Sequence, residues 1–479
     1  MKHLAEIKSY LQAKGLSKLL PMIGGNPRTL TTVIEKLKDH AIEVTLKTVE
    51  GGEYMKRKRR EGINNLFEMA KRSLPRLSKE TRKKFAVNLF FNEMHLGSKA
   101  RNAYLKEHGE APPFFIVISP SMRCNLSCYG CYAGDYDKSQ ELTFEEVDRV
   151  VQECKDVMGI YFITISGGEP TIWPHLFDLV EKHDDVMFQM YTHGMNIDEK
   201  MAKRLAKVGN LYPAISIEGD EENTNARRGP DAWKKVTEAM CRLRDNGALF
   251  GFSATHTRRN HEALMNTDFY DKMVECGAAF GWIFQYILIG RNPAPELVPT
   301  AQQRVERFDI IEKVRSTRPL LVFDFWNDGE FTEGCIAWGR RYLHVQATGY
   351  VEPCVFVHFA KDNIREKTLT EIVNSDCFAE ARKLHPYSDD HRRPCSLIDN
   401  REVLPYLAEK YGMIPTHDGA DGIIKPPLRD AVVKTSLEYE QALAPTKEEH
   451  KVPNYNAEAH KGLKHAGDRH PSHAGSARR

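Results

Sequence analysis

The chain has 479 residues, long enough for about two or three domains with at least one large core. It is 41% hydrophobic and 28% charged, which is the composition of an ordinary globular protein. Its formal net charge of +2 is nearly neutral for this length, so no nucleic-acid partner is expected on electrostatic grounds.

The N-terminal stretch "MKHLAEIKSYLQAKG" is amphipathic and rich in lysine, and it lacks the apolar core of a secretory signal. No apolar run approaches the roughly 20 residues that are needed to cross a bilayer. We therefore expect a cytoplasmic protein. In that compartment the ten cysteines are metal ligands or core residues rather than a disulfide framework.

Residues 1–112 are predicted to form a helical and basic N-terminal region. "NNLFEMAKRSL" and "TRKKFAVNLFFNEM" place apolar residues at helical spacing. The basic run "KRKRR", Lys56–Arg60, precedes them. It is interpreted first as a solvated helical face. The alternative is a docking surface for an acidic electron donor or an anionic lipid surface, which would give peripheral membrane association.

Residues 113–325 alternate between strand-like and helix-like segments. The helix predicted for "TFEEVDRVVQECKDVMG" has a capping box at Thr143 and Glu146, and Gly159 is predicted to end it. Alternating strands and helices predict parallel pairing, here an α/β fold with a full or partial barrel of the (β/α)6 type. A doubly wound open sheet is the alternative. The six predicted strands are "FFIVIS", "IYFITIS", "VMFQMYT", "AISIE", "LFGFSAT" and "WIFQYILI".

Beyond residue 325 the alternation stops. Residues 326–402 are predicted to form a small extension with a cysteine-bearing β-hairpin and a helix, and residues 403–437 a C-terminal helical segment. Residues 438–479 are polar and rich in His, Lys and Pro, so a disordered tail is predicted there.

Three cysteines, Cys124, Cys128 and Cys131, follow the first predicted strand with the spacing C-x3-C-x2-C. A structural zinc site needs four ligands, and this loop has no fourth Cys or His. Cys154 lies on the apolar stripe of the next helix and is interpreted as a core residue. Three thiolates suit a 4Fe–4S cluster in which the fourth iron is open to an exogenous ligand.

This loop, together with "SGGEP" (Ser166–Pro170) at the end of the next strand, resembles the radical SAM superfamily. The resemblance implies that the cluster binds S-adenosylmethionine. Reductive cleavage then releases a 5′-deoxyadenosyl radical, which abstracts hydrogen from a substrate. Gly167 and Gly168 would let the backbone approach the ligand, and Glu169 would accept hydrogen bonds from its ammonium group.

Three later segments resemble the same superfamily in the same order. "YTHG" implies that Thr192 contacts the adenosyl ligand, and "SIEG" implies that Ser216 and Glu218 face ribose or carboxylate. "NARRG" offers Arg227 or Arg228, of which we favour Arg228, to the methionine carboxylate. Ordinary hydrogen bonding at the barrel rim is the alternative for Arg228 and Ser216.

Two features limit the resemblance. Many members carry an aromatic residue just before the third cysteine, where this chain has Gly130, so the contact with adenine is left open. His193 and His256 lie at predicted strand ends, where a catalytic role is conceivable. Without an identifiable partner, both are interpreted as structural.

A second group of cysteines lies in the extension. Cys335 and Cys354 bracket the predicted hairpin, and Cys395 follows a predicted helix that carries Cys377. This arrangement resembles the auxiliary-cluster extensions of radical SAM enzymes, of the SPASM or shorter Twitch type. The resemblance implies one auxiliary iron–sulfur cluster held by Cys335, Cys354 and Cys395, with Cys377 structural. Zinc on the same thiols is the alternative.

The resemblance implies an oxidoreductase that takes electrons from reduced ferredoxin or flavodoxin and modifies its substrate oxidatively. A peptide, a lipid or isoprenoid chain, and a small metabolite all remain open as the substrate. A zinc or iron–sulfur scaffold without enzymatic activity is the rival hypothesis, but such a scaffold has no need of Gly-Gly-Glu-Pro after the cysteine loop.

Overall fold

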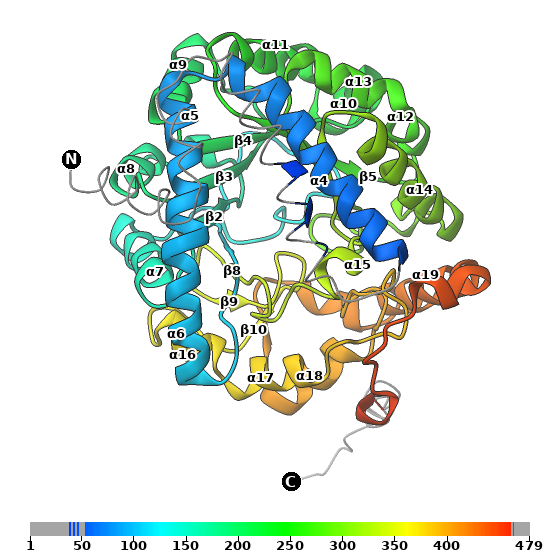
Figure 1. Ribbon diagram of the computed structural model, residues 1–479. Helices are drawn as coiled ribbons and strands as arrows, with labels where there is room; N and C mark the ends of the chain where they lie inside the picture. Colours follow the sequence, from blue (N-terminus) through cyan, green and yellow to red (C-terminus); the bar gives the residue numbers. More distant parts are fainter. Residues whose placement is uncertain (1–37, 40–41, 44–45, 47–52, 461–462, 464–479) are drawn as a thin grey trace.

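The computed structural model (Figure 1) describes residues 38–39, 42–43, 46, 53–460 and 463. The amphipathic stretch at the N-terminus and the last part of the predicted tail lie outside the described residues. Within the described part, no helix is both long and apolar enough to cross a membrane.

Seven parallel strands form the centre of the molecule, and they pair in the order in which they occur along the chain. This order confirms the α/β fold and the barrel-type winding, because a doubly wound sheet reverses its strand order. Six of these strands were predicted; the seventh, β7, was not. The strands are β1 (Ile116–Ile118), β2 (Phe162–Ile165), β3 (Met187–Thr192), β4 (Leu211–Ser216), β5 (Gly251–His256), β6 (Phe280–Gln285) and β7 (Leu321–Asp324).

Helices connect successive strands and bury one apolar face against the sheet. In α7, Thr143 and Glu146 form the predicted capping box, and Val147 and Val150 are fully buried. The helix ends at Asp156, so Gly159 lies in the following turn rather than at the helix end. The helices are α7 (Phe144–Asp156), α8 (Leu176–Lys182), α9 (Glu199–Val208), α10 (Glu221–Arg228), α11 (Ala232–Asp245), α12 (His261–Met265), α13 (Thr267–Cys276) and α14 (Ala301–Thr317).

The N-terminal region is helical, as predicted, and it covers one end of the barrel. Its elements are α4 (Glu53–Ser73), α5 (Lys79–Ala86), the π-helix η3 (Val87–Gly97) and α6 (Ser98–His108); Figure 1 shows α4 crossing the strands. Its apolar side chains pack against residues at or just before the starts of strands β3 to β6. This cluster includes Met69, Leu74, Leu77, Ala86 and Phe91 on the helices, and Met187, Tyr212, Leu249 and Ala279 on the barrel.

The basic run Lys56–Arg60 lies on α4, and one of its members contacts the barrel and another the extension. Lys58 pairs with Glu312 of α14. Arg59 donates to the backbone oxygen of Phe331 at 3.2 Å. Two residues of the basic run therefore help to hold α4 in place. The run is not the wholly solvated face that the first interpretation expected.

The extension is built onto the core sheet. The predicted hairpin is present as β8 (His344–Val345) and β9 (Val351–Glu352), which pair antiparallel. β8 also pairs parallel with β1, so the sheet has nine strands with β7 and β9 at its described edges. The helices and further strand of the extension are α15 (Gly329–Thr332), β10 (Phe359–Ala360), α16 (Leu369–Val373) and α17 (Asp376–Lys383). The segment predicted as helical, 403–437, contains α18 (Val403–Tyr411) and also a short strand, β11 (Ile414–Pro415), which pairs antiparallel with β10.

The predicted disordered tail is wrong for residues 438–460. Helix α19 (Leu428–Leu443) continues past residue 438, and the 3-10 helices η7 (Ala444–His450) and η8 (Ala457–His460) follow it. Tyr439 and Leu443 are buried, and the Arg392 side chain donates to the Leu443 backbone oxygen at 3.2 Å. His450, also buried, pairs with Glu330. These few buried contacts hold the segment although its average composition is polar.

Candidate active site

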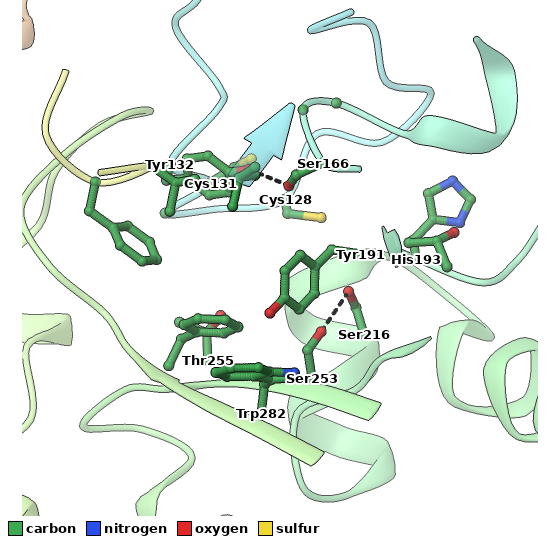
Figure 2. A pocket seen from close by; sticks show the side chains of 18 of the residues that line it. Cys128, Cys131, Tyr132, Ser166, Tyr191, His193, Ser216, Ser253, Thr255 and Trp282 are labelled. Atoms are coloured by element: carbon green, nitrogen blue, oxygen red, sulfur yellow. Dashed lines mark hydrogen bonds between the residues drawn. The ribbon is translucent and has the colours of Figure 1, made fainter. Parts of the chain in front are cut away.

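The three cysteines of the first group lie in the loop between β1 and α7, at the carboxyl end of β1. Cys124, Cys128 and Cys131 are partly exposed, and all three line one cavity of about 170 Å³ (Figure 2). Burial raises the pKa of the Cys124 and Cys131 thiols, and the Arg227 guanidinium opposes this shift at Cys131. The sequence spacing therefore brings the three sulfurs to a single site.

The two glycines after β2, Gly167 and Gly168, let two backbone segments of the protein come close together, whereas the sequence predicted a close approach to the ligand. A side chain at Gly168 would place its Cβ 2.0 Å from the Arg123 oxygen. Gly167 has a φ of 110°, and its Cβ would lie 2.3 Å from the Ser121 oxygen. Both glycines line the cavity, so this turn holds the start of the cysteine loop against the site.

Glu169 is 2% exposed and lines the same cavity. Its Oε1 accepts hydrogen bonds from the Thr171 and Thr192 hydroxyls, each at 2.6 Å. Its Oε2 accepts from the His193 backbone N–H at 2.9 Å. Thr192, predicted to contact the adenosyl ligand, therefore orients Glu169 and also lines the cavity.

His193 links the end of β3 to the cysteine loop. Its Nδ1 accepts from the Met195 N–H at 3.0 Å, so Nε2 carries the proton and donates to Asn125 Oδ1 at 2.8 Å. Burial lowers the pKa of His193, which favours this neutral tautomer. His256 is also buried, and its two nitrogens contact His261 and Arg307. The contacts of His193 and of His256 agree with the interpretation of both histidines as structural residues.

Glu218 lies behind the cavity wall rather than in it. Its Oε1 accepts from Arg227 at 2.8 Å and from Arg228 Nε at 2.9 Å, and its Oε2 from the Thr255 N–H at 3.1 Å. Burial opposes ionisation, but the two arginines hold the pKa of Glu218 below its ordinary value. Arg227, Arg228 and Ser216 do line the cavity. Glu218 thus positions the two arginines.

Tyr286 fills the space beside Gly130, and sequence reasoning did not find it. Gly130 has a φ of 59°, and a Cβ there would lie 2.4 Å from Tyr286 Cε2. The Tyr286 hydroxyl accepts from the Ala294 N–H at 2.9 Å, which fixes the ring. The chain therefore brings an aromatic ring to the cysteine loop from the end of β6. The only sequence signal was the unusual glycine before Cys131.

The cavity wall across from the thiols is largely aromatic and was also missed. Figure 2 shows Tyr191 and Trp282 on that side, with the hydroxyls of Ser216, Ser253 and Thr255 beside them. The rings pack on one another, with centroids 5.5 Å apart for Tyr191 and Phe284. Other aromatic residues of the lining are Phe115, Tyr132, Tyr286, Phe325, Tyr342 and Phe356.

The second cysteine group lines a separate cavity of about 370 Å³. Cys335, Cys354 and Cys395 face it, whereas Cys377 is fully buried on α17 and is absent from its lining, in agreement with the structural assignment. Burial raises the pKa of Cys395 to about 12. Across residues 53–460 and the few other described positions, no three His, Cys, Asp or Glu side chains are arranged to hold a single metal ion.

Cys395 is held by a buried ion pair. Arg304 of α14 binds the Asp399 carboxylate through two contacts, at 2.6 and 3.1 Å. Asp399 Oδ2 also accepts from the Cys395 backbone N–H at 3.1 Å. The pair therefore ties the third cysteine of this group to the barrel.

Family models match both cysteine regions. The model of the radical SAM superfamily matches residues 118–267, which contain all three cysteines of the first group. This chain is a radical SAM enzyme. The model of the SPASM iron–sulfur cluster-binding domain matches residues 335–397, from Cys335 past Cys395. The second group therefore belongs to an iron–sulfur domain, which replaces the zinc and scaffold alternatives.

Several curated proteins are similar to the chain. Mycofactocin maturase MftC of Mycobacterium tuberculosis is 26% identical over 301 residues, which cover 58% of this chain and 74% of that protein. PqqA peptide cyclase of Bradyrhizobium diazoefficiens is 26% identical over 260 residues, covering 50% and 66%. Fe-coproporphyrin III synthase of Methanosarcina barkeri is 29% identical over 168 residues, covering 34% and 42%.

The side chains that are present suit the cofactors of this superfamily. Three thiols on one loop leave one iron of a 4Fe–4S cluster without a protein sulfur, and the same cavity offers a carboxylate and two guanidinium groups to an amino acid. When bound, the reduced cluster cleaves S-adenosylmethionine to the radical that abstracts hydrogen from the substrate. The protein supplies the ligands, the orientation and the enclosed cavity.

Proposed function

We propose that this radical SAM enzyme oxidises an uncharged, aromatic or aliphatic side chain of a peptide substrate. The observation that carries the proposal is that charged and aromatic side chains line different parts of the cavity. Glu169 and Arg227 lie beside the cysteine loop: the Glu169 N–H donates to the Arg123 oxygen at 2.8 Å, and Arg227 donates to the backbone oxygens of Tyr129 and Gly130 at 3.4 Å. Arg228 shares the Glu218 carboxylate with Arg227. Tyr191 and Trp282, by contrast, lie across the cavity from the thiols (Figure 2).

A charged substrate group at the aromatic wall would lose its hydration without gaining a partner, and that transfer costs several kcal/mol or more. A neutral ring or alkyl group would instead bury apolar surface there. The hydroxyls of Ser253 and Thr255 leave room for a neutral polar atom at the edge of the wall.

The names of two relatives support a peptide. One is called a peptide cyclase and another a maturase, while a third is a synthase of Fe-coproporphyrin III. An acyl or isoprenoid chain would also suit an apolar wall, so lipid remains the competing substrate class. Among the relatives that cover at least half of this chain, two are named PqqA peptide cyclase and one AdoMet-dependent heme synthase, so a small metabolite is a second competing class. We favour the peptide because more of these names state a peptide.

We assign the site residues as follows. Cys124, Cys128 and Cys131 hold the first cluster, and Cys335, Cys354 and Cys395 hold one auxiliary cluster. The backbone of Gly167 and Gly168 and the side chains of Glu169, Thr192, Ser216 and Arg228 surround S-adenosylmethionine. Glu218 acts indirectly, through the two arginines that it binds.

The proposed oxidation balances as follows. The 5′-deoxyadenosyl radical takes one hydrogen atom from the substrate and becomes 5′-deoxyadenosine. The substrate radical would then lose one electron and, as a new bond forms, one proton to solvent; Cys335, Cys354 and Cys395 would hold the auxiliary cluster that takes up this electron. The electron that starts each cleavage comes from a reduced ferredoxin or flavodoxin, which the partly exposed first cysteine group leaves room to approach.

We propose the radical SAM core at 113–325 and the auxiliary-cluster extension at 326–402, and the two family matches fall within these limits. A cytoplasmic location belongs to the same proposal, because six cysteine ligands must stay reduced. Peripheral membrane association through the basic run stays a prediction, and the contacts of Lys58 with the barrel and of Arg59 with the extension weaken its basis.

The substrate proposal is tested by hydrogen transfer. The reconstituted enzyme is incubated anaerobically with reductant, S-adenosylmethionine and deuterated cell extract, separated into peptide, lipid and small-metabolite fractions. We expect deuterium in 5′-deoxyadenosine from the peptide fraction. Deuterium from the lipid or the metabolite fraction alone would overturn the peptide assignment.

A further inference from the structure

Tyr342 stands between the two cysteine cavities. It follows Cys335 by seven positions, immediately precedes Leu343 and β8, and is 1% exposed. Its ring lines both the cavity of the first cysteine group and the cavity of the second. Four other aromatic residues share this double position: Phe115, Trp282, Phe325 and Phe356. Together these five residues form the wall that separates the two sites.

Tyr342 differs from the other four rings because it contacts a predicted cluster ligand. Its hydroxyl donates a hydrogen bond to Cys354 Sγ at 2.6 Å. Among the described hydrogen bonds, it is the one that joins a ring of this wall to a cysteine sulfur. The Tyr342 ring is also held in place, because Phe115 stacks on it with ring centroids 5.1 Å apart and an angle of 6° between the ring planes.

A hydrogen bond to a ligand sulfur changes the redox properties of an iron–sulfur cluster. Adding an electron increases the negative charge on the sulfurs, and a donor aimed at one of them stabilises that charge. The reduced state gains more from the donor than the oxidised state does, so the reduction potential rises. The Tyr342 hydroxyl, buried away from water, has this geometry toward Cys354.

We propose that Tyr342 is a positioning residue that raises the reduction potential of the auxiliary cluster and holds its Cys354 ligand against the wall of the substrate cavity. This inference rests on the proposed function, in which the auxiliary cluster accepts one electron from the substrate radical. A higher potential favours that transfer, and Tyr342 itself is neither oxidised nor reduced overall.

The test compares three variants of the full-length, reconstituted enzyme. Tyr342→Phe keeps the ring and removes the donor, and Tyr342→Leu removes both. Tyr387→Phe is the matched control: this tyrosine is also buried in the extension, but its hydroxyl donates to the Ala381 backbone oxygen at 2.9 Å. Iron content and the midpoint potential of each cluster are measured by redox titration with electron paramagnetic resonance. S-adenosylmethionine is added to identify the signal of the first cluster.

We expect Tyr342→Phe to retain its iron and to shift the midpoint potential of the auxiliary cluster to a more negative value. At a fixed applied potential, the reduced fraction of that cluster should fall several-fold. Tyr342→Leu should show at least the same shift, and Tyr387→Phe none. An unchanged potential in Tyr342→Phe, or an equal shift in Tyr387→Phe, would overturn the inference.

Loss of the auxiliary iron in Tyr342→Phe would also overturn it, because the hydroxyl would then be needed for cluster assembly rather than for its potential. The titration contains no substrate. Its result is therefore independent of whether the peptide assignment succeeds or fails in the deuterium experiment.

Discussion

The two cysteine groups reach similar ligand sets by different routes. The first comes from one loop, residues 124–131, and all three of its thiols are partly exposed; in the second, Cys354 is buried while Cys335 and Cys395 are partly exposed. The second takes one cysteine from each of three segments that are up to 60 residues apart, and its site depends on a hairpin, a buried ion pair and an aromatic wall. A locally built site can keep its ligands when distant segments change, whereas a site assembled from three segments depends on the folding of the whole extension.

Substitutions in the two cysteine groups should have different effects, and the largest effect is expected in the first group. Cys128→Ala should abolish formation of 5′-deoxyadenosine from S-adenosylmethionine, because radical formation starts at the cluster that this thiol helps to hold. The measurement is 5′-deoxyadenosine under anaerobic reducing conditions. Cleavage that persists at the wild-type rate would contradict the assignment of the loop.

Cys354→Ala should have a smaller and different effect. We expect the protein to lose about one cluster of iron and yet to retain uncoupled cleavage of S-adenosylmethionine, because the first loop does not depend on the hairpin for its ligands. Iron and sulfide are counted per chain beside the cleavage assay. Unchanged iron content would refute the auxiliary assignment.

Asp399→Ala tests whether the second site depends on the fold. Removing one partner of a buried pair costs about 3–5 kcal/mol, and here it also frees the Cys395 N–H from its acceptor. We expect a lower urea midpoint and partial loss of auxiliary iron, with the first cluster retained.

Asp271→Ala is the control for this variant, since Asp271 pairs with Arg318 but its side chain is 49% exposed. Exposed pairs contribute about 0–1 kcal/mol, so its urea midpoint should hardly move. Equal destabilisation by both substitutions would show that the buried pair has no special role.

Gly130→Ala tests the packing of the first loop. The added Cβ meets the Tyr286 ring, and overpacking of this kind costs about 1–3 kcal/mol, which corresponds to roughly 5–150-fold in binding or rate. We expect weaker binding of S-adenosylmethionine and slower cleavage. The double variant with Tyr286→Ala should relieve the clash, and two losses that simply add would argue against direct packing.

Lys58→Ala should have the smallest effect, because neither Lys58 nor its partner Glu312 lines either cysteine cavity. Its pair with Glu312 is partly buried, and we expect about 1 kcal/mol of destabilisation. Both clusters and the cleavage rate should be unchanged. A loss of iron would mean that the N-terminal helices influence the two cluster sites.

Local patterns predicted the features that depend on neighbouring residues. The capping box of α7, the alternation of strands and helices, and the three-cysteine loop each occupy a short stretch, so their physical causes can be read from it. The assignment of Cys377 to the core followed in the same way, from its place on one side of a helix.

Contacts between distant segments were not predictable from one sequence. The pairing of β8 with β1, the ring of Tyr286 beside Gly130, and the Tyr342 hydroxyl at Cys354 each join residues that no local period relates. The tail prediction failed for a related reason: average polarity indicated disorder, but a few buried side chains such as Tyr439 hold residues 438–460 in place.

The pairing of β8 with β1 also determines how the enzyme can be divided. A fragment that stops at residue 325 would leave β1 as an uncovered sheet edge, with backbone groups that pair readily with another chain. Such a minimal barrel should self-associate even though it keeps every residue of the radical-forming loop. Shortened versions made for crystallography or engineering should therefore retain the hairpin, with or without its iron.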